Sequence, residues 1–154
     1  MPRAAGRGTR AGEPAMAGPD WTAAKAPSIA ELEAMADQVF AGLDATFRAA
    51  CGNLVIAVED FPTDDVLDEM GAESEFDLLG LFQGVGLAQQ GEPRTGETPN
   101  MIWLYRRAIL DYWAEFDEPL GRIIAHVLIH EIGHQMGLSD EDMERIEAAA
   151  GEGR

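Results

Sequence analysis

The stretch His130-Glu131-Ile132-Gly133-His134 lies inside a long apolar run, residues 120–136, whose length suits a helix. Residues four apart on a helix lie one above the other on the same face. His130 and His134 can therefore hold one zinc ion, and Glu131 stands beside that ion as a general base. The pattern predicts that a metal-binding helix forms the centre of the domain.

Apolar residues cover most of the circumference of this predicted helix, which indicates that the helix is buried. They are Leu120, Ile123, Ile124, Val127, Leu128, Ile129, Ile132 and Met136. Asp117 or Glu118 is expected to cap the helix, with Pro119 in its first turn and Gly137 at its end. The metal site would thus lie on a rigid central element.

The sequence around this helix predicts an α+β domain. Ser28 and Glu31 form a capping box at the start of a helix expected to reach about residue 51. Short strands are predicted at 54–58, 78–83 and 101–105, and short helices at 63–70, 108–116 and 142–150. Residues 84–100 are rich in glycine and predict a mobile loop. We expect a small sheet packed against the N-terminal helix and the central helix.

Charge divides the 154-residue chain into a tail and a body. The net charge is −17, yet residues 1–27 hold four basic and two acidic residues, a surplus of +2, so residues 28–154 carry −19. The tail has no apolar periodicity and is predicted to be disordered. The sequence therefore predicts one domain, residues 28–154, after a disordered tail, residues 1–27.

Composition excludes several classes of protein. An acidic body repels phosphate backbones, so nucleic-acid binding is not expected. No apolar run reaches the roughly 18 residues of a membrane span, and the N-terminal residues lack the apolar core of a signal peptide. A single cysteine, Cys51, cannot form an internal disulfide. We expect a cytoplasmic protein that does not bind membranes.

A catalytic zinc ion needs three protein ligands and one open position. Asp140 follows His134 by six residues, and Gly137 lets the chain turn back between them. Alternatively, Asp140 caps the final helix, as Ser139 also could with Asp142 as partner. We favour Asp140 as the third ligand. His126 lies about 12 Å along the helix axis from His134, too far for one ion to bind both.

The segment from His130 to Asp140 resembles the zincin signature His-Glu-x-x-His-x-x-Gly-x-x-Asp. With Leu104-Tyr105-Arg106-Arg107 and Ile109-Leu110-Asp111 upstream, the chain is similar to the small bacterial minimal-zincin metallopeptidases from about residue 28 to residue 150. The resemblance implies a zincin-like fold, with His130, His134 and Asp140 as zinc ligands and Glu131 as catalytic base. It implies no particular substrate beyond a peptide or protein.

Two functions follow from these residues. The first is a zinc-dependent peptidase, in which Glu131 takes a proton from a zinc-activated water. The second is a zinc-stabilised module that binds a peptide or protein with little or no catalysis. Many zincins stabilise the oxyanion with a downstream Tyr or His, and this sequence has none, so Tyr105, Tyr112 and Arg106 are the upstream candidates. Without such a group, we expect low activity.

Overall fold

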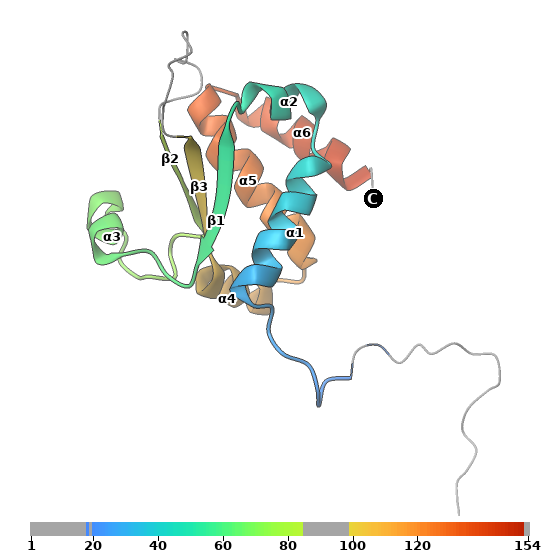
Figure 1. Cartoon of the computed structure of the whole chain (residues 1–154), viewed down its shortest axis with the longest axis vertical. Coiled ribbons are helices and arrows are strands. Elements are labelled where there is room, and N and C mark those ends of the chain that lie inside the picture. The colour runs from blue at the N-terminus through green and yellow to red at the C-terminus, as the bar shows by residue number, and fades with distance from the viewer. Residues whose placement is uncertain (1–17, 19, 85–98, 153–154) are drawn as a thin grey trace, which may run out of the picture.

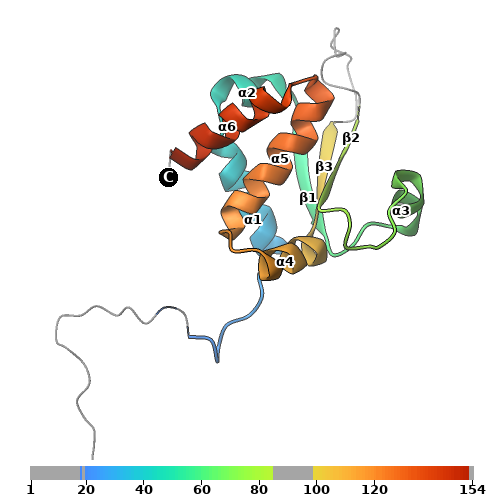
Figure 2. The same cartoon turned by 180° about the vertical axis from the view of Figure 1, so that it is seen from behind.

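A computed structural model of the protein describes residues 18, 20–84 and 99–152. Helices α1 and α5 cover one face of a three-stranded sheet, and α6 packs on α5 (Figures 1 and 2). The helices are α1 (Ile29–Ala41), α2 (Ala45–Ala50), α3 (Asp64–Met70), α4 (Arg106–Glu115), α5 (Leu120–Met136) and α6 (Asp140–Glu152). The strands are β1 (Leu54–Glu59), β2 (Gly80–Gln83) and β3 (Asn100–Tyr105). The predicted α+β domain, with a small sheet against the first and central helices, is confirmed.

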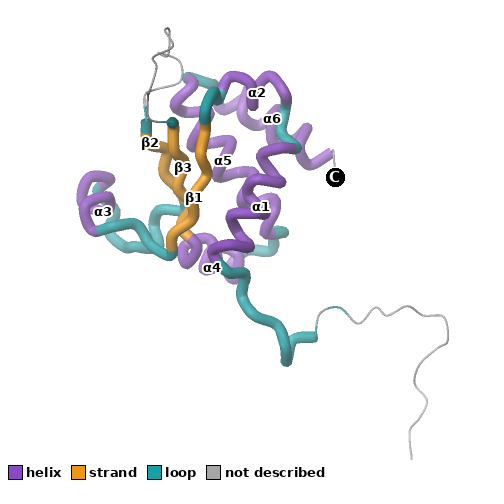
Figure 3. Tube along the Cα trace, in the orientation of Figure 1, coloured by secondary structure: helices purple, strands orange, loops and turns teal. Residues whose placement is uncertain are grey.

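The sheet has the strand order β1-β3-β2, so β1 and β2 are its edges (Figure 3). β1 is parallel to β3, and β2 is antiparallel to it. Ile56, Ile102 and Phe82 are paired across the three strands, and Ile102 and Phe82 are buried. Alternation along the strands therefore turns one apolar face of the sheet toward the helices.

Gly80 explains how β2 approaches α5. A Cβ at this position would lie 2.6 Å from Val127 Cγ1 and 3.0 Å from the carbonyl oxygen of Trp103. Any larger residue would push the strand away from the helix. The glycine that interrupts the strand pattern in the sequence is therefore what lets β2 lie directly against α5. The strand itself begins at Gly80, two residues later than predicted.

The predicted N-terminal helix is two helices, which corrects the sequence analysis. α1 ends at Ala41, with Gly42 as its C-cap, and α2 begins at Ala45. Asp44 caps the second helix, since the Phe47 N–H donates to its Oδ2 at 2.9 Å. The apolar spacing continues through the break because Leu43 and Phe47 are both buried in the same core. Periodicity alone therefore joined two helices that a glycine and a new cap separate.

The predicted caps of α1 and α3 are confirmed, whereas the predicted cap of α5 is not. The Glu31 N–H donates to Ser28 Oγ at 3.1 Å, and the Ser28 N–H donates to Glu31 Oε1 at 2.9 Å. Thr63 caps α3, and Gly71 ends it in the left-handed conformation, with φ 67°. The predicted cap of α5 is wrong: Pro119, not Asp117 or Glu118, holds the N-cap position, and its backbone is extended. The fixed φ of proline suits this position as well as the first turn.

Gly133 sets the contact between α5 and α6. A Cβ there would lie 2.6 Å from Met143 Sδ and 2.9 Å from Met143 Cγ. Met143 is fully buried, and Gly133 is buried beside it. This glycine of the histidine motif therefore lets the final helix pack closely across the central one.

Two predictions fall largely outside the described residues. These are most of the tail, residues 1–27, and most of the loop, residues 84–100. The boundary between tail and domain stays a prediction. In the part of the chain that the structure describes, no helix combines the length and apolar character needed to cross a membrane.

Candidate metal centre

Three histidines form a row along α5 at intervals of four residues. The rings of His126 and His130 are stacked, with centroids 4.0 Å apart and an interplanar angle of 27°. The rings of His130 and His134 lie edge to face, with centroids 6.0 Å apart and an angle of 79°. Two nitrogens bound to one tetrahedral zinc lie about 3.4 Å apart. Ring nitrogens of His126 and His130 lie within 4.8 Å of each other, so these two imidazoles are within reach of a shared ion.

Glu131 lies beside this row in the sequence of α5. It follows Val127 by four residues, so the two share a face of the helix, and Val127 is the residue that Gly80 contacts. Burial raises the pKa of the half-buried Glu131 carboxyl, and the charge of nearby His134 lowers it by a smaller amount. A carboxylate that binds a proton more readily than usual is suited to general-base work.

Asp140 is exposed at the start of α6. Gly137 turns the chain before it, with φ 81°. Ser139 caps the helix, since its Oγ accepts from the Asp142 N–H at 3.0 Å and its own N–H lies 3.4 Å from Asp142 Oδ2. The alternative role of Asp140 as the cap is therefore not what the structure shows. The Asp140 carboxylate is not used by the cap.

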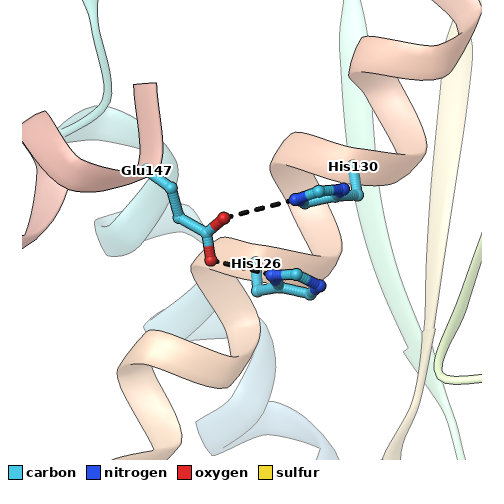
Figure 4. Close-up of side chains that lie close together, drawn as sticks. All are labelled: His126, His130 and Glu147. Carbon is cyan, nitrogen blue, oxygen red and sulfur yellow. Dashed lines mark hydrogen bonds and ion pairs between the residues drawn. The ribbon is translucent and has the colours of Figure 1, made fainter. Parts of the chain in front are cut away.

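Glu147 is the site residue that the sequence analysis missed. Its Oε2 lies 2.8 Å from His126 Nδ1, and its Oε1 lies 3.2 Å from His130 Nε2 (Figure 4). Within the described ranges, one group of three potential ligands has all its ligand atoms within 4.8 Å of one another: His126, His130 and Glu147. His134 and Asp140 are outside it, so the ligand set His130, His134 and Asp140 stays a prediction.

A signal for Glu147 was present in the sequence. It follows Met143 by four residues and precedes Ala150 by three, and both of these are buried. Glu147 is therefore a carboxylate on the inward face of the final helix. A charged residue on that face needs a partner. The row of histidines on α5 provides that partner.

The upstream candidates for an oxyanion helper lie elsewhere. Tyr105 is buried, and burial, followed by the charge of Glu59, raises its pKa to about 12. Arg106 Nη1 lies 2.9 Å from Asp60 Oδ1, and its Nε donates to the Pro27 carbonyl oxygen at 2.6 Å. Tyr112 is on α4, packed against Phe116 with ring centroids 4.4 Å apart. α4 lies near the end of α5 where that helix begins, whereas the motif lies toward its other end (Figure 1).

The sequence matches the family described as zincin-like metallopeptidase over residues 51–150, well over half of the chain. The chain belongs to the zincin-like metallopeptidase family. The matched region contains all three strands, helices α3 to α5 and nearly all of α6. It begins after α1, which packs on α5 and β1. No curated protein matches the sequence. Zincins normally bind zinc, so membership indicates a zinc-dependent metallopeptidase and a hydrolase.

Proposed function

We propose that this protein is a zinc-dependent peptidase that hydrolyses peptide bonds, with Glu131 as general base. His130 and His134 would hold the ion, and Asp140 would complete the set. The position of Glu131 is the observation that carries this proposal. It is half-buried on a central helix, next to two imidazoles on successive turns and four residues after Val127, which β2 contacts. A purely structural zinc site does not need such a base.

The donor set fits zinc, because it combines two imidazoles with carboxylates nearby. When bound, zinc supplies Lewis acidity to a substrate carbonyl and to water. Glu131 accepts the proton of the attacking water and delivers it to the leaving amine. The raised pKa of the Glu131 carboxylate favours the first transfer, because it makes the carboxylate a stronger base.

Strand β2 is where we place the substrate. It is an edge strand: it pairs with β3 on one side, and no strand in the described ranges pairs with it on the other side. An extended peptide can add to such an edge as a further strand. Because Gly80 holds β2 against Val127, and Val127 shares its helix face with Glu131, a peptide on β2 would run close to the base.

The second candidate function is a zinc-stabilised module that binds a peptide or protein with little or no catalysis. The placement of the oxyanion candidates favours it. Tyr105 is buried and Arg106 is engaged by Asp60 and Pro27, so neither faces an approaching substrate freely. Loss of one oxyanion donor costs about 10²- to 10³-fold in rate. The two functions differ in turnover, not in metal or peptide binding.

The variant Glu131→Gln separates them. We expect it to keep zinc, measured by elemental analysis, and to lose turnover by about 10²- to 10⁴-fold. Turnover is measured as cleavage of a proteome-derived peptide library, followed by mass spectrometry, which samples many peptide sequences at once. Glu144→Gln is the matched control, because Glu144 is an exposed glutamate on α6. Cleavage that survives Glu131→Gln contradicts the peptidase mechanism, and a zinc-loaded parent that cleaves nothing supports the binding module.

A further inference from the structure

Outside the predicted ligand set, one carboxylate already contacts the histidine row. Glu147 reaches from α6 to His126 and His130 on α5, one oxygen to each ring (Figure 4). The two imidazoles face the carboxylate through different nitrogens, Nδ1 of His126 and Nε2 of His130. Two nitrogens and a carboxylate are a donor set that zinc and similar divalent transition metals prefer.

The spacing of these atoms suits an ion. The separations of 2.8 Å and 3.2 Å between nitrogen and oxygen are close to the roughly 3.4 Å expected between neighbouring ligands of a tetrahedral zinc. All three ligand atoms lie within 4.8 Å of one another. An ion pair alone would need one imidazole, whereas here two imidazoles meet the same carboxylate.

The group is also held in place by packing. Met143, one turn before Glu147, is fully buried against Gly133, one turn after His130. His130 and Glu147 are each 23% exposed, whereas His126 is 53% exposed. The inner part of the group is therefore fixed by the contact between α5 and α6, and the His126 side is open to solvent. An ion can enter there and keep water as its remaining ligand.

We propose that His126, His130 and Glu147 form a second site for a divalent transition-metal ion such as zinc. This site overlaps the motif site at His130, and it rests on the proposed function only in sharing that residue. A neutral imidazole offers one unprotonated nitrogen to a metal, so His130 serves one site at a time. The chain thus has two alternative three-residue sites, one completed by Glu147 and the other by His134 and Asp140.

The test removes the motif site and asks whether metal binding remains. Full-length protein carrying His134→Asn is titrated with cobalt(II), followed by its visible absorption, and zinc is then measured by competition. We expect this variant to bind one ion per chain. Adding His126→Asn or Glu147→Gln should weaken that binding at least about 10-fold. Adding the matched control Glu144→Gln should leave it unchanged.

Nitrogen-15 NMR of the imidazole rings provides a measurement on the unmodified protein. The chain has three histidines, so single variants assign every ring. In His134→Asn, zinc should shift the nitrogens of both His126 and His130. In the parent, zinc should shift the ring of His126 in the fraction that occupies the second site.

The outcomes distinguish this proposal from the proposed function. If His134→Asn binds no cobalt, or binds it regardless of His126→Asn and Glu147→Gln, the second site does not exist. A His126 ring that stays unshifted in His134→Asn under saturating zinc leads to the same conclusion. None of these results bears on catalysis, because the peptidase proposal fails only when turnover survives Glu131→Gln or when the zinc-loaded parent cleaves nothing.

Discussion

The two ends of the histidine row on α5 differ in how complete they are. At one end, His126 and His130 already meet Glu147 at 2.8 Å and 3.2 Å. At the other end, His134 and Asp140 are exposed and belong to no compact group of three ligands among the described residues. The sequence motif includes His134, at the second end, whereas the structure brings three potential ligands together at the first end.

The difference has a physical cause. Glu147 is in the middle of α6, one turn beyond the buried contact between Met143 and Gly133. Asp140 is at the first position of the same helix, three residues after the turn at Gly137. Packing between two helices therefore fixes one carboxylate, whereas the other is positioned by a short connection. A metal ion would contribute more of the organisation at the Asp140 end.

The largest effect is expected at His130, the residue that the two ends share. His130→Asn should weaken zinc binding at least about 100-fold, because it removes a ligand from both sites. His126→Asn and His134→Asn each leave one site intact and should have smaller effects. Competition with a fluorescent zinc indicator measures all three. Equal losses in the three variants would show that the two ends are not alternatives.

Asp140→Ala is the next test, and it concerns the end of the histidine row at His134 and Asp140. In a His126→Asn background, which keeps only the predicted motif site, Asp140→Ala should weaken zinc binding by about 10- to 100-fold or more. Ser139→Ala removes the observed cap of α6 and should cost about 1 kcal/mol of unfolding free energy while zinc binding is retained. Asp142→Ala should likewise retain zinc. If Asp140→Ala leaves zinc affinity unchanged in the His126→Asn background, Asp140 is not a ligand.

Gly133→Ala tests the contact between α5 and α6 that holds Glu147 beside His126 and His130. Its methyl group would meet Met143 at 2.6 Å, so we expect a loss of about 1–3 kcal/mol in the free energy of unfolding by urea. Gly137→Ala meets no atom within 4 Å but places alanine at φ 81°, which costs roughly 1–2 kcal/mol.

Adding Met143→Ala to each glycine variant separates the two causes. The Met143 change should couple to Gly133→Ala by about 0.5–3 kcal/mol, because the two residues touch. It should be additive with Gly137→Ala, whose cost is conformational. Additivity in both pairs would mean that the contact between Gly133 and Met143 does not limit the approach of α6.

The smallest effect is expected far from both ends, at the N-terminus. Deleting residues 1–26 keeps Pro27, whose carbonyl oxygen accepts from Arg106, and should change the free energy of unfolding by less than about 0.5 kcal/mol. Arg106→Gln is the positive control and should cost about 1–3 kcal/mol, since it removes the bonds to Pro27 and Asp60. A deletion as costly as Arg106→Gln would show that residues before Pro27 stabilise the domain.

Much of the fold could be predicted because its signals are local. The capping box of Ser28 and Glu31, the cap at Thr63 and the left-handed glycines Gly71 and Gly137 act within a few residues of the chain. The break between α1 and α2 was missed because apolar spacing continues across it. Strand order could not be derived, since the pairing of β1 with β3 joins segments more than forty residues apart.

The candidate site shows the same difference between local and long-range signals. His130, Glu131 and His134 follow from spacing on one helix. Glu147 does not, because its contact with His126 and His130 depends on the angle and distance between two helices. That geometry depends on the absence of a side chain at Gly133, which the motif treats as a variable position.

Asp140 and Glu147 lie on the same helix, α6, seven residues and about 10 Å apart along its axis. Met143 lies between them and packs against Gly133, so a tilt of α6 relative to α5 would pivot about this contact. A tilt of α6 about this contact that brings Asp140 nearer to α5 moves Glu147 farther from α5, and the reverse tilt does the opposite. A substitution at Gly133 or Met143 that changes the distance between the two helices therefore changes the position of both acidic residues relative to α5.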